Sequence, residues 1–411
     1  MTVIQRGQLS KYFDGVAVKK LSVVETTPKK SNQHEFNGAK VLRELLGEAE
    51  RRRIPTRFIW FSSENEGVTD DGFLSWYDSR KKKVHRNAEY RLYYLTNSVS
   101  GLMKAGDTLF LALRPDGTAM VIIAASGSTI QSQLLWMFGV DEPELQFTVK
   151  EIGSDFAKSD FALRYILDEL GIEPEEPESD KLDRLLAPFG NKFPSTRVFS
   201  ALARKSLRHI NALDDPDAVL MAWLEREELL FRRLERKLVS DRLNAGFSIG
   251  GVADVDGFLR FSLHVQNRRK SRAGQSLENQ LEALFLARNI KFERGVETEN
   301  KNRPDFLFPG GKEYQDRGFP DAHLLVLGAK STCKDRWRQV LSEAKRIKHK
   351  HLLTLEPGIS ENQTDEMQAK KLQLILPARL HETYREKQRA YLMNLSEFIE
   401  LAHSRQASVL S

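Results

Sequence analysis

The sequence predicts a multidomain protein in which a β-rich N-terminal unit precedes an α/β C-terminal unit. Three observations lead to this prediction. Strand-like apolar runs recur within residues 1–172, an acidic and proline-broken stretch follows at 173–180, and helical and strand patterns alternate from residue 277 onward. A chain of 411 residues is long enough for two or three domains.

The N-terminal unit, residues 1–172, is expected to be built mostly from strands. Its strand-like runs are rich in β-branched and aromatic residues, and they lie at 57–61, 91–95, 108–113 and 119–124. Arg114-Pro115-Asp116-Gly117 predicts a turn between the last two runs. Gly38 to Arg53 has a helical pattern.

The C-terminal unit, residues 181–411, divides into a helical portion at 181–260 and a core at 261–411. Ala218 to Leu243 has helical periodicity with dense charge, which predicts a packing helix or a dimer helix. Within the core we expect helices at 277–289, 334–348 and 363–371, and strands at 305–308, 324–330, 351–355 and 372–376. This alternation is typical of an α/β fold.

The composition narrows the classes of function. Lys and Arg total 63 against 57 Asp and Glu, and the resulting charge of +6 suits a nucleic-acid partner. The single cysteine, Cys333, excludes an internal disulfide framework and a zinc site built on several thiolates, and we expect it to be packed. Without an apolar run of about 18–20 residues or a signal-peptide core, the protein is expected to be cytoplasmic. The sequence has no P-loop, which argues against NTP-driven translocation.

The stretch from Arg303 to Glu343 carries the most chemical information. It contains an acid, Asp305, then a lysine, Lys330, at the end of an apolar run, and then a second acid, Glu343, on an expected helix. Two carboxylates can hold Mg²⁺ through oxygen atoms and leave positions for water and phosphate. A lysine beside them can orient that water or neutralise charge on the phosphoryl group. The pattern therefore predicts metal-dependent phosphodiester cleavage.

One position departs from the usual nuclease pattern, which places an acid two residues before the lysine. Here that position is Gly328. Glu343 follows Lys330 by 13 residues, on a helix whose apolar face is expected to comprise Trp337, Val340, Leu341 and Ala344. A glutamate on such a helix can point back to the strand end and replace the missing acid.

Three further motifs are long and unusual: Asn267 to Gly274, Pro304 to Pro309 and Cys333 to Gln339. They closely resemble the catalytic domain of the EcoRII family of restriction endonucleases. The spacings between Asp305, Tyr314, Lys330, Lys334 and Glu343 resemble that family too. The resemblance covers roughly residues 181–411, and Lys192 to Ser195 and Leu213 to Asp217 extend it upstream of the core.

This resemblance implies a variant of the PD-(D/E)XK nuclease fold, in which the second acid has migrated to the helix. Asp305, Lys330 and Glu343 are then the catalytic set. Asp305 and Glu343 hold Mg²⁺, and Tyr314 and Lys334 support them.

The start of the helix after Lys330 is expected to read DNA. An arginine can bond to both acceptor atoms of guanine, and an aspartate can accept from cytosine. By resemblance, Asp335 and Arg336 read adjacent C·G pairs in a target with a CC…GG core. The alternative is a surface helix that carries an ion pair.

A basic run precedes an amphipathic helix that is expected to open at Ser276. It comprises Arg268, Arg269, Lys270 and Arg272. We expect most of the run to contact phosphate groups, because phosphate contacts outnumber base contacts in such interfaces. A base contact from Arg268 or Arg272 is the sharper alternative. Glu278 is expected to be a surface acid of the helix rather than an additional metal ligand.

A second basic stretch, Trp76 to Asn87, interleaves aromatic and basic residues. This composition suits phosphate binding with base contact, and equally a solvated charged hairpin. The stretch resembles the effector-binding domain of the EcoRII family, a pseudobarrel related to plant B-three DNA-binding domains. The match is carried by Tyr77, Ser79, Arg80, Arg86 and Asn87, and Lys81 is a further candidate contact. The resemblance implies a second DNA site that regulates cleavage.

Together these features predict a Mg²⁺-dependent type II restriction endonuclease that cuts double-stranded DNA under the control of its N-terminal domain. A palindromic target needs two active sites, so a homodimer is expected. A restriction system also implies a cognate cytosine methyltransferase as a genetic partner. Two alternatives stay open: a nuclease that responds to modified or damaged DNA, and a DNA-binding regulator that no longer cuts. The intact acid–lysine–acid set argues against the second.

Overall fold

The structure, a computed structural model, describes residues 8–26, 34–36, 39–62, 67–81, 85, 87–152, 160–172, 179–333 and 336–410. The chain divides into two compact units, of which the first comprises Met1–Leu170 with Pro357–Gln363 and the second Gly171–Glu356 with Thr364–Ser411. Each unit has its own apolar core. The expected linker at 173–180 lies mostly outside the described residues, and its last two positions already belong to a helix.

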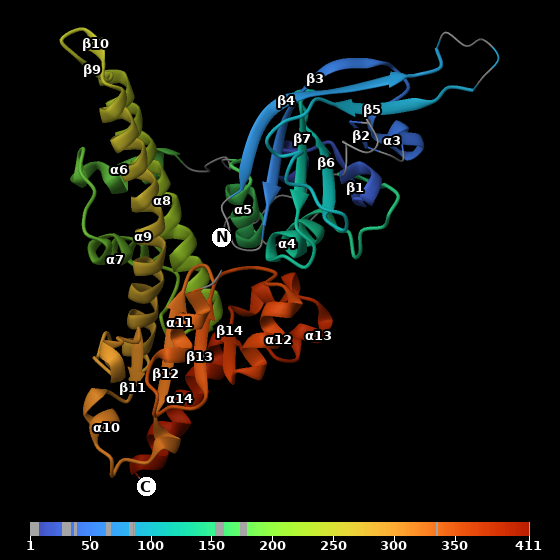
Figure 1. Cartoon of the computed structure of the whole chain (residues 1–411). Coiled ribbons are helices and arrows are strands. Elements are labelled where there is room, and N and C mark those ends of the chain that lie inside the picture. Colours follow the sequence, from blue (N-terminus) through green and yellow to red (C-terminus); the bar gives the residue numbers. More distant parts are fainter. Residues whose placement is uncertain are drawn as a thin grey trace. The chain divides into compact units, whose positions relative to one another are not determined.

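The first unit is built on a sheet whose described strands follow the order β2-β5-β4-β3-β7-β6-β1-β8 (Figure 1). The strands are β1 (Gly15–Lys20), β2 (Glu35–Phe36), β3 (Arg51–Phe61), β4 (Val68–Asp78), β5 (Tyr90–Tyr94), β6 (Thr108–Leu113), β7 (Ala119–Ala124) and β8 (Thr148–Glu151). The helices are α1 (Val23–Thr26), α3 (Ala39–Leu46), α4 (Thr129–Phe138) and α5 (Asp160–Glu169). The unit is therefore rich in β-structure, as predicted, and its closure into a pseudobarrel stays a prediction.

One N-terminal element differs from the prediction. The helix expected from Gly38 to Arg53 ends at Leu46, where Gly47 takes a φ of 77°. That left-handed conformation suits glycine and commonly ends a helix. Arg51 then begins β3, which pairs with β4 and has an irregularity in register between Arg51 and Ile54.

The second unit joins a helical portion to a small mixed sheet (Figure 1). The helical portion contains α6 (Ser179–Leu186), α7 (Thr196–Ser206), α8 (Pro216–Ala245) and α9 (Val255–Ala287), with the hairpin β9 (Ser248–Ile249) and β10 (Val252–Ala253) between the last two. The sheet contains β11 (Phe306–Phe308), β12 (Leu325–Lys330), β13 (Lys350–Thr354) and β14 (Leu372–Ile375). Its remaining helices are α10 (Gly311–Gln315), α11 (Trp337–Ser342), α12 (Glu361–Ala369), α13 (Glu386–Arg389) and α14 (Leu395–Leu410).

The sheet has the order β11-β12-β13-β14, and its register positions the ends of β11 and β12. β11 runs antiparallel to β12, whereas β12, β13 and β14 are parallel. The four expected strands of this unit are confirmed with their ends shifted by no more than one residue. Within the described part of the chain, no helix is long and apolar enough to span a membrane.

Two helix predictions in this unit were wrong at their boundaries. The helix expected to open at Ser276 is the C-terminal end of α9, which begins at Val255, so the basic run lies inside a helix. Asp254 caps that early start by accepting from the Gly257 N–H. The helix expected at 334–348 is described only as α11, and it ends at Ser342.

Candidate active site

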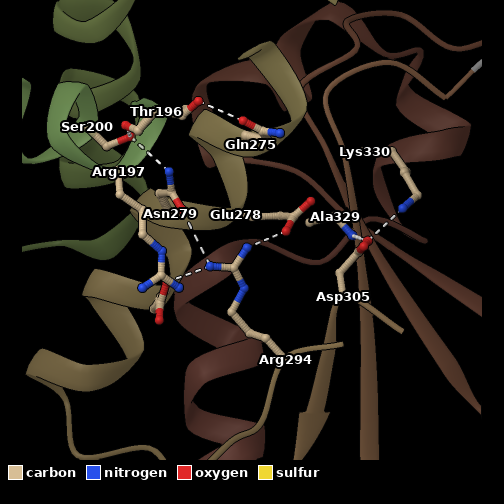
Figure 2. A network of polar contacts seen from close by, with 11 residues as sticks. Thr196, Arg197, Ser200, Gln275, Glu278, Asn279, Arg294, Asp305, Ala329 and Lys330 are labelled. Carbon is tan, nitrogen blue, oxygen red and sulfur yellow. Dashed lines mark hydrogen bonds and ion pairs between the residues drawn. The ribbon is translucent and has the colours of Figure 1, made fainter. Parts of the chain in front are cut away.

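Asp305 and Lys330 meet where β11 begins and β12 ends. Because Phe306 pairs with Leu327 in the antiparallel ladder, Asp305 and Lys330 come close together at this end of the two strands. Lys330 Nζ lies 2.7 Å from Asp305 Oδ2, and the Ala329 N–H donates to the same oxygen, also at 2.7 Å (Figure 2). The two side chains are only 18% and 15% exposed, so this ion pair is weakly screened by solvent. The structure thus brings the predicted acid and lysine together.

Glu343 contributes a second carboxylate from the residue that follows α11. Its backbone is extended, with φ −78° and ψ 148°, and so it lies outside the helix on which it was expected. Burial and the nearby Asp305 carboxylate raise the pKa of Glu343 to about 7. Among the described residues, its buried Oε2 atom has no hydrogen-bond partner. A buried acceptor without a donor, beside a second carboxylate, is an arrangement that a bound cation would satisfy.

The chemistry of this donor set fits a hard divalent cation. Mg²⁺ binds through one or two carboxylates and keeps water or phosphate as its other ligands. Asp305 and Glu343 could supply those two carboxylates. No cluster of three or more His, Cys, Asp or Glu side chains suited to a metal occurs in the described ranges.

Gly328 shows why the second acid is not on β12. A Cβ atom added at this position would lie 2.7 Å from Val340 Cγ2 and 3.3 Å from Val340 Cγ1. The close approach of α11 to the strand therefore leaves no room for a side chain at 328. A second acid would have to come from another segment, and Glu343, directly after α11, is the candidate.

Tyr314, a predicted supporting residue, contacts Glu299 and the segment that follows Glu343. Its hydroxyl group contacts both carboxylate oxygens of Glu299, at 2.6 and 2.7 Å, and accepts from the Arg346 N–H at 3.3 Å. Burial and the hydrogen bond to Glu299 raise the pKa of Tyr314 well above its ordinary value, so it stays a neutral donor. Lys334, the other predicted supporting residue, lies outside the described residues.

Of the two residues expected to read DNA, Asp335 lies outside the described residues and Arg336 is described. Arg336 is exposed and immediately precedes α11. Its N–H donates to the Cys333 carbonyl at 2.7 Å, and its guanidinium group donates to Thr332 Oγ1 at 3.1 Å. Cys333 itself is fully buried, as predicted, and burial raises the pKa of its thiol.

The basic run on α9 separates into inward and outward residues. Arg272 is only 8% exposed, and its guanidinium group lies over the rings of Phe193, Phe199 and Phe231. Arg269 pairs with the buried Glu235 at 2.6 Å. The guanidinium group of Arg268 lies 4.3 Å from the centre of the Phe193 ring, whereas Lys270 is exposed. Helical periodicity turns Arg268 and Arg272 to one face, where Arg272 is packed against aromatic rings, and phosphate contact by the exposed Lys270 stays a prediction.

Glu278 is engaged by an arginine that sequence patterns did not single out. Arg294 forms an ion pair with Glu278 (Figure 2). It also forms an ion pair with Glu282 at 2.5 Å, and its guanidinium group lies over the Phe306 ring. Arg294 therefore links α9 to β11, the strand that follows Asp305. The Glu278 carboxylate is thus paired with Arg294.

The N-terminal basic stretch makes ion pairs within its own unit. Arg80 Nε lies 2.5 Å from Glu89 Oε2, Lys81 lies 3.3 Å from Glu50, and Ser79 donates to the Glu89 carbonyl at 3.0 Å. Tyr77 receives the Arg52 guanidinium group 4.4 Å from its ring centre. Arg86 lies outside the described residues, and Asn87 is exposed. DNA binding by this stretch stays a prediction.

Comparisons with known proteins connect this site to a family. The chain is 43% identical over 186 residues to the type II restriction enzyme EcoRII of Escherichia coli. Residues 231–399 match the family model described as EcoRII C terminal. The match to the family model lies in the C-terminal part of the chain. The alignment covers 45% of this chain and 45% of EcoRII, so the chain spans about half the length of that relative.

Two solved structures of restriction endonucleases also resemble the chain. Metal-depleted Ecl18kI in complex with uncleaved, modified DNA has a TM-score of 0.46 and 17% identity, covering 57% of this chain and 86% of that one. The PspGI–substrate DNA complex has a TM-score of 0.44 and 14% identity, covering 53% and 94%. The similarity to EcoRII has the higher sequence identity.

Proposed function

We propose that this protein is a type II restriction endonuclease that hydrolyses double-stranded DNA at a CC…GG-containing site with Mg²⁺. The observation that carries this proposal is the meeting of Asp305, Lys330 and Glu343, which lie far apart in the sequence, with a buried Glu343 oxygen left without a hydrogen-bond donor. The relationship of residues 231–399 to EcoRII supports it.

Each residue of the site has a defined task in this reaction. Asp305 and Glu343 would hold Mg²⁺, which when bound polarises the phosphate and lowers the pKa of a water molecule. Lys330, held at Asp305, orients the attacking water and neutralises charge that builds on the phosphoryl oxygens. Glu343 must lose its proton to act as a ligand, which its raised pKa places near neutral pH.

DNA recognition is proposed for the loop after Lys330 and for the exposed side of α9. Arg336 is exposed close in sequence to the catalytic lysine, which suits a contact with guanine, and Asp335 is its proposed partner for cytosine. Lys270 is proposed to contact phosphate. The N-terminal unit is proposed to bind a second DNA segment through the stretch from Tyr77 to Asn87 and to regulate cleavage.

A homodimer is proposed because a palindromic target presents two bonds to two active sites. The N-terminal end of α9 exposes a series of large apolar side chains, at 63% for Val255, 45% for Phe258, 52% for Leu259 and 58% for Leu263. Exposed apolar side chains gathered on one element often mark an interaction surface. Such a surface is suited to a second copy of the chain.

A cleavage assay with Mg²⁺ on unmethylated and cytosine-methylated phage DNA, followed by end sequencing, tests the proposal. We expect discrete cuts at a CC…GG-containing site, lost in Lys330→Ala. Cleavage confined to methylated DNA would indicate a modification-dependent nuclease. DNA binding without metal-dependent cleavage, in the full chain and after removal of residues 1–180, would indicate a non-cleaving regulator.

A further inference from the structure

The chain leaves α11 abruptly at the residue that carries the second acid. Glu343 is extended, and Ala344 has a φ of 45°, in the left-handed region that residues with a Cβ atom adopt at a cost. Between Trp337 and Arg346 there is no glycine or proline to end the helix. Contacts from other segments must therefore impose this ending.

The backbone N–H groups after Glu343 donate hydrogen bonds to side chains of other segments. The Ala344 N–H donates to Thr298 Oγ1 at 3.4 Å, and the Lys345 N–H donates to Glu299 Oε2 at 3.1 Å. Glu299 is itself held by the Tyr314 hydroxyl group, which accepts from the Arg346 N–H. In a continuing helix these N–H groups would bond to carbonyls of α11.

The carbonyl groups around Glu343 accept hydrogen bonds from the side chains of Lys350 and Asn302. Lys350 Nζ donates to the Glu343 carbonyl and, at 3.0 Å, to the Ala344 carbonyl. Asn302 Nδ2 donates to the Ser342 carbonyl at 2.9 Å. Lys350 begins β13 and is only 6% exposed, so its ammonium group depends on these carbonyls for hydrogen bonds in place of water.

We propose that Lys350 and Glu299 are positioning residues, which hold the main chain at Glu343 and directly after it and so fix its carboxylate beside Asp305. The inference rests on the proposed function of Glu343 as a metal ligand. All of these contacts reach peptide groups of the segment, so the Glu343 side chain stays available to a cation. Without them, residues 343–346 regain the option of extending α11, which would rotate the carboxylate away from Asp305.

Calorimetric titration of the full chain with Ca²⁺ tests the inference without relying on cleavage. We expect Lys350→Met to weaken Ca²⁺ binding at least tenfold and Glu299→Gln to weaken it several-fold. Lys350→Arg, which keeps the charge and the donors, should recover part of the loss. Lys348→Met is the matched control, because Lys348 is exposed on the same segment, and it should bind as the wild type does.

A cleavage assay adds a reading that a general loss of structure would not give. In Lys350→Met we expect the Mg²⁺ concentration for half-maximal cleavage to rise at least tenfold, while the KM for DNA stays within twofold of the wild type. Melting temperatures identify which variants are folded. If Lys350→Met fails to fold, Glu299→Gln and Lys350→Arg decide the question.

The two proposals fail in different ways. If folded Lys350→Met and Glu299→Gln bind Ca²⁺ with wild-type affinity, the positioning role is overturned. If Asp305→Asn loses Ca²⁺ binding in the same experiment, the proposal of a metal site still stands. Wild-type protein that binds no Ca²⁺, or binds it equally well as Asp305→Asn, would contradict the metal site and with it this inference.

Discussion

At the scale of single residues, the lack of space for an acid at Gly328 is linked to the proposed role of Glu343 as the second acid. Replacing Gly328 with Asp restores the usual spacing of acid and lysine, but the new side chain would meet Val340 at 2.7 Å. We expect Gly328→Asp to lose about 1–3 kcal/mol of unfolding free energy, as overpacking does, and to gain no activity. Urea unfolding and cleavage assays check this. A Gly328→Asp/Glu343→Gln double variant that cleaves like the wild type would contradict it.

Lys330 is expected to act on the transition state rather than on DNA affinity. Lys330→Ala should reduce single-turnover cleavage by about 10²–10³-fold, the usual cost of removing one electrostatic stabiliser from an active site. Binding to a cognate duplex should change little, because phosphate contacts elsewhere supply most of the affinity. Filter binding measured beside cleavage checks both parts. An equal loss of affinity and rate would assign Lys330 to binding.

The raised pKa of Glu343 predicts how stability changes with pH. Its folded-state pKa of about 7 exceeds the ordinary value, so folding favours the protonated form. The stability that this form contributes is fully present below the ordinary glutamate pKa of about 4.3 and is lost as pH rises through the folded pKa. Glu343→Gln, which cannot ionise, should therefore melt above the metal-free wild type at about pH 8 and by a clearly smaller margin at about pH 5. An equal difference at both pH values would contradict this.

At the scale of elements, α9 predicts a division of labour within its basic run. Arg272 is packed among three phenylalanine rings, so Arg272→Ala should lower the free energy of unfolding by about 1–3 kcal/mol. Lys270→Ala, on the exposed side, should change stability by less than about 0.5 kcal/mol but weaken DNA binding and its salt dependence. Urea unfolding and binding at several salt concentrations check this. A large loss of stability in Lys270→Ala would reverse the assignment.

Elements were predictable from sequence where the local pattern alone decides them. The side chains of β11 to β14 are mostly buried, so their apolar runs mark the strands in the sequence. The predicted ends of these strands are confirmed to within one residue. The end of α11 was not predictable, because Glu299 and Lys350 decide it from other segments. In the sequence after α11, the sign of this helix end was Lys350, a lysine at the start of an apolar strand.

The residues of the candidate site could be proposed from the sequence, but the contacts that surround them could not. Asp305, Lys330 and Glu343 follow from spacing and family resemblance. The inward turn of Arg272 and the Arg294 ion pairs depend on how α9 packs, which a motif of five residues does not contain.

At the scale of the whole molecule, the two apolar cores predict separable units. A fragment that begins at Gly171 retains the core clusters built on α6, α7 and α8 and around Tyr314. We expect it to unfold cooperatively, and to keep the target and the dependence on Lys330 of the full chain while its cleavage rate changes. Calorimetry and end sequencing check these points. A fragment with an altered target would assign base recognition to the N-terminal unit.

The main-chain contacts around Glu343 have a consequence for protein engineering. The hydrogen bonds that Lys350 and Glu299 form with this segment reach peptide groups, so these hydrogen bonds do not require a particular side chain at position 343. Position 343 is therefore a candidate for exchange of the proposed metal ligand. Histidine there would favour softer transition metals over Mg²⁺. A library restricted to this one residue would show whether the metal preference of the proposed site changes while the proposed DNA contacts stay the same.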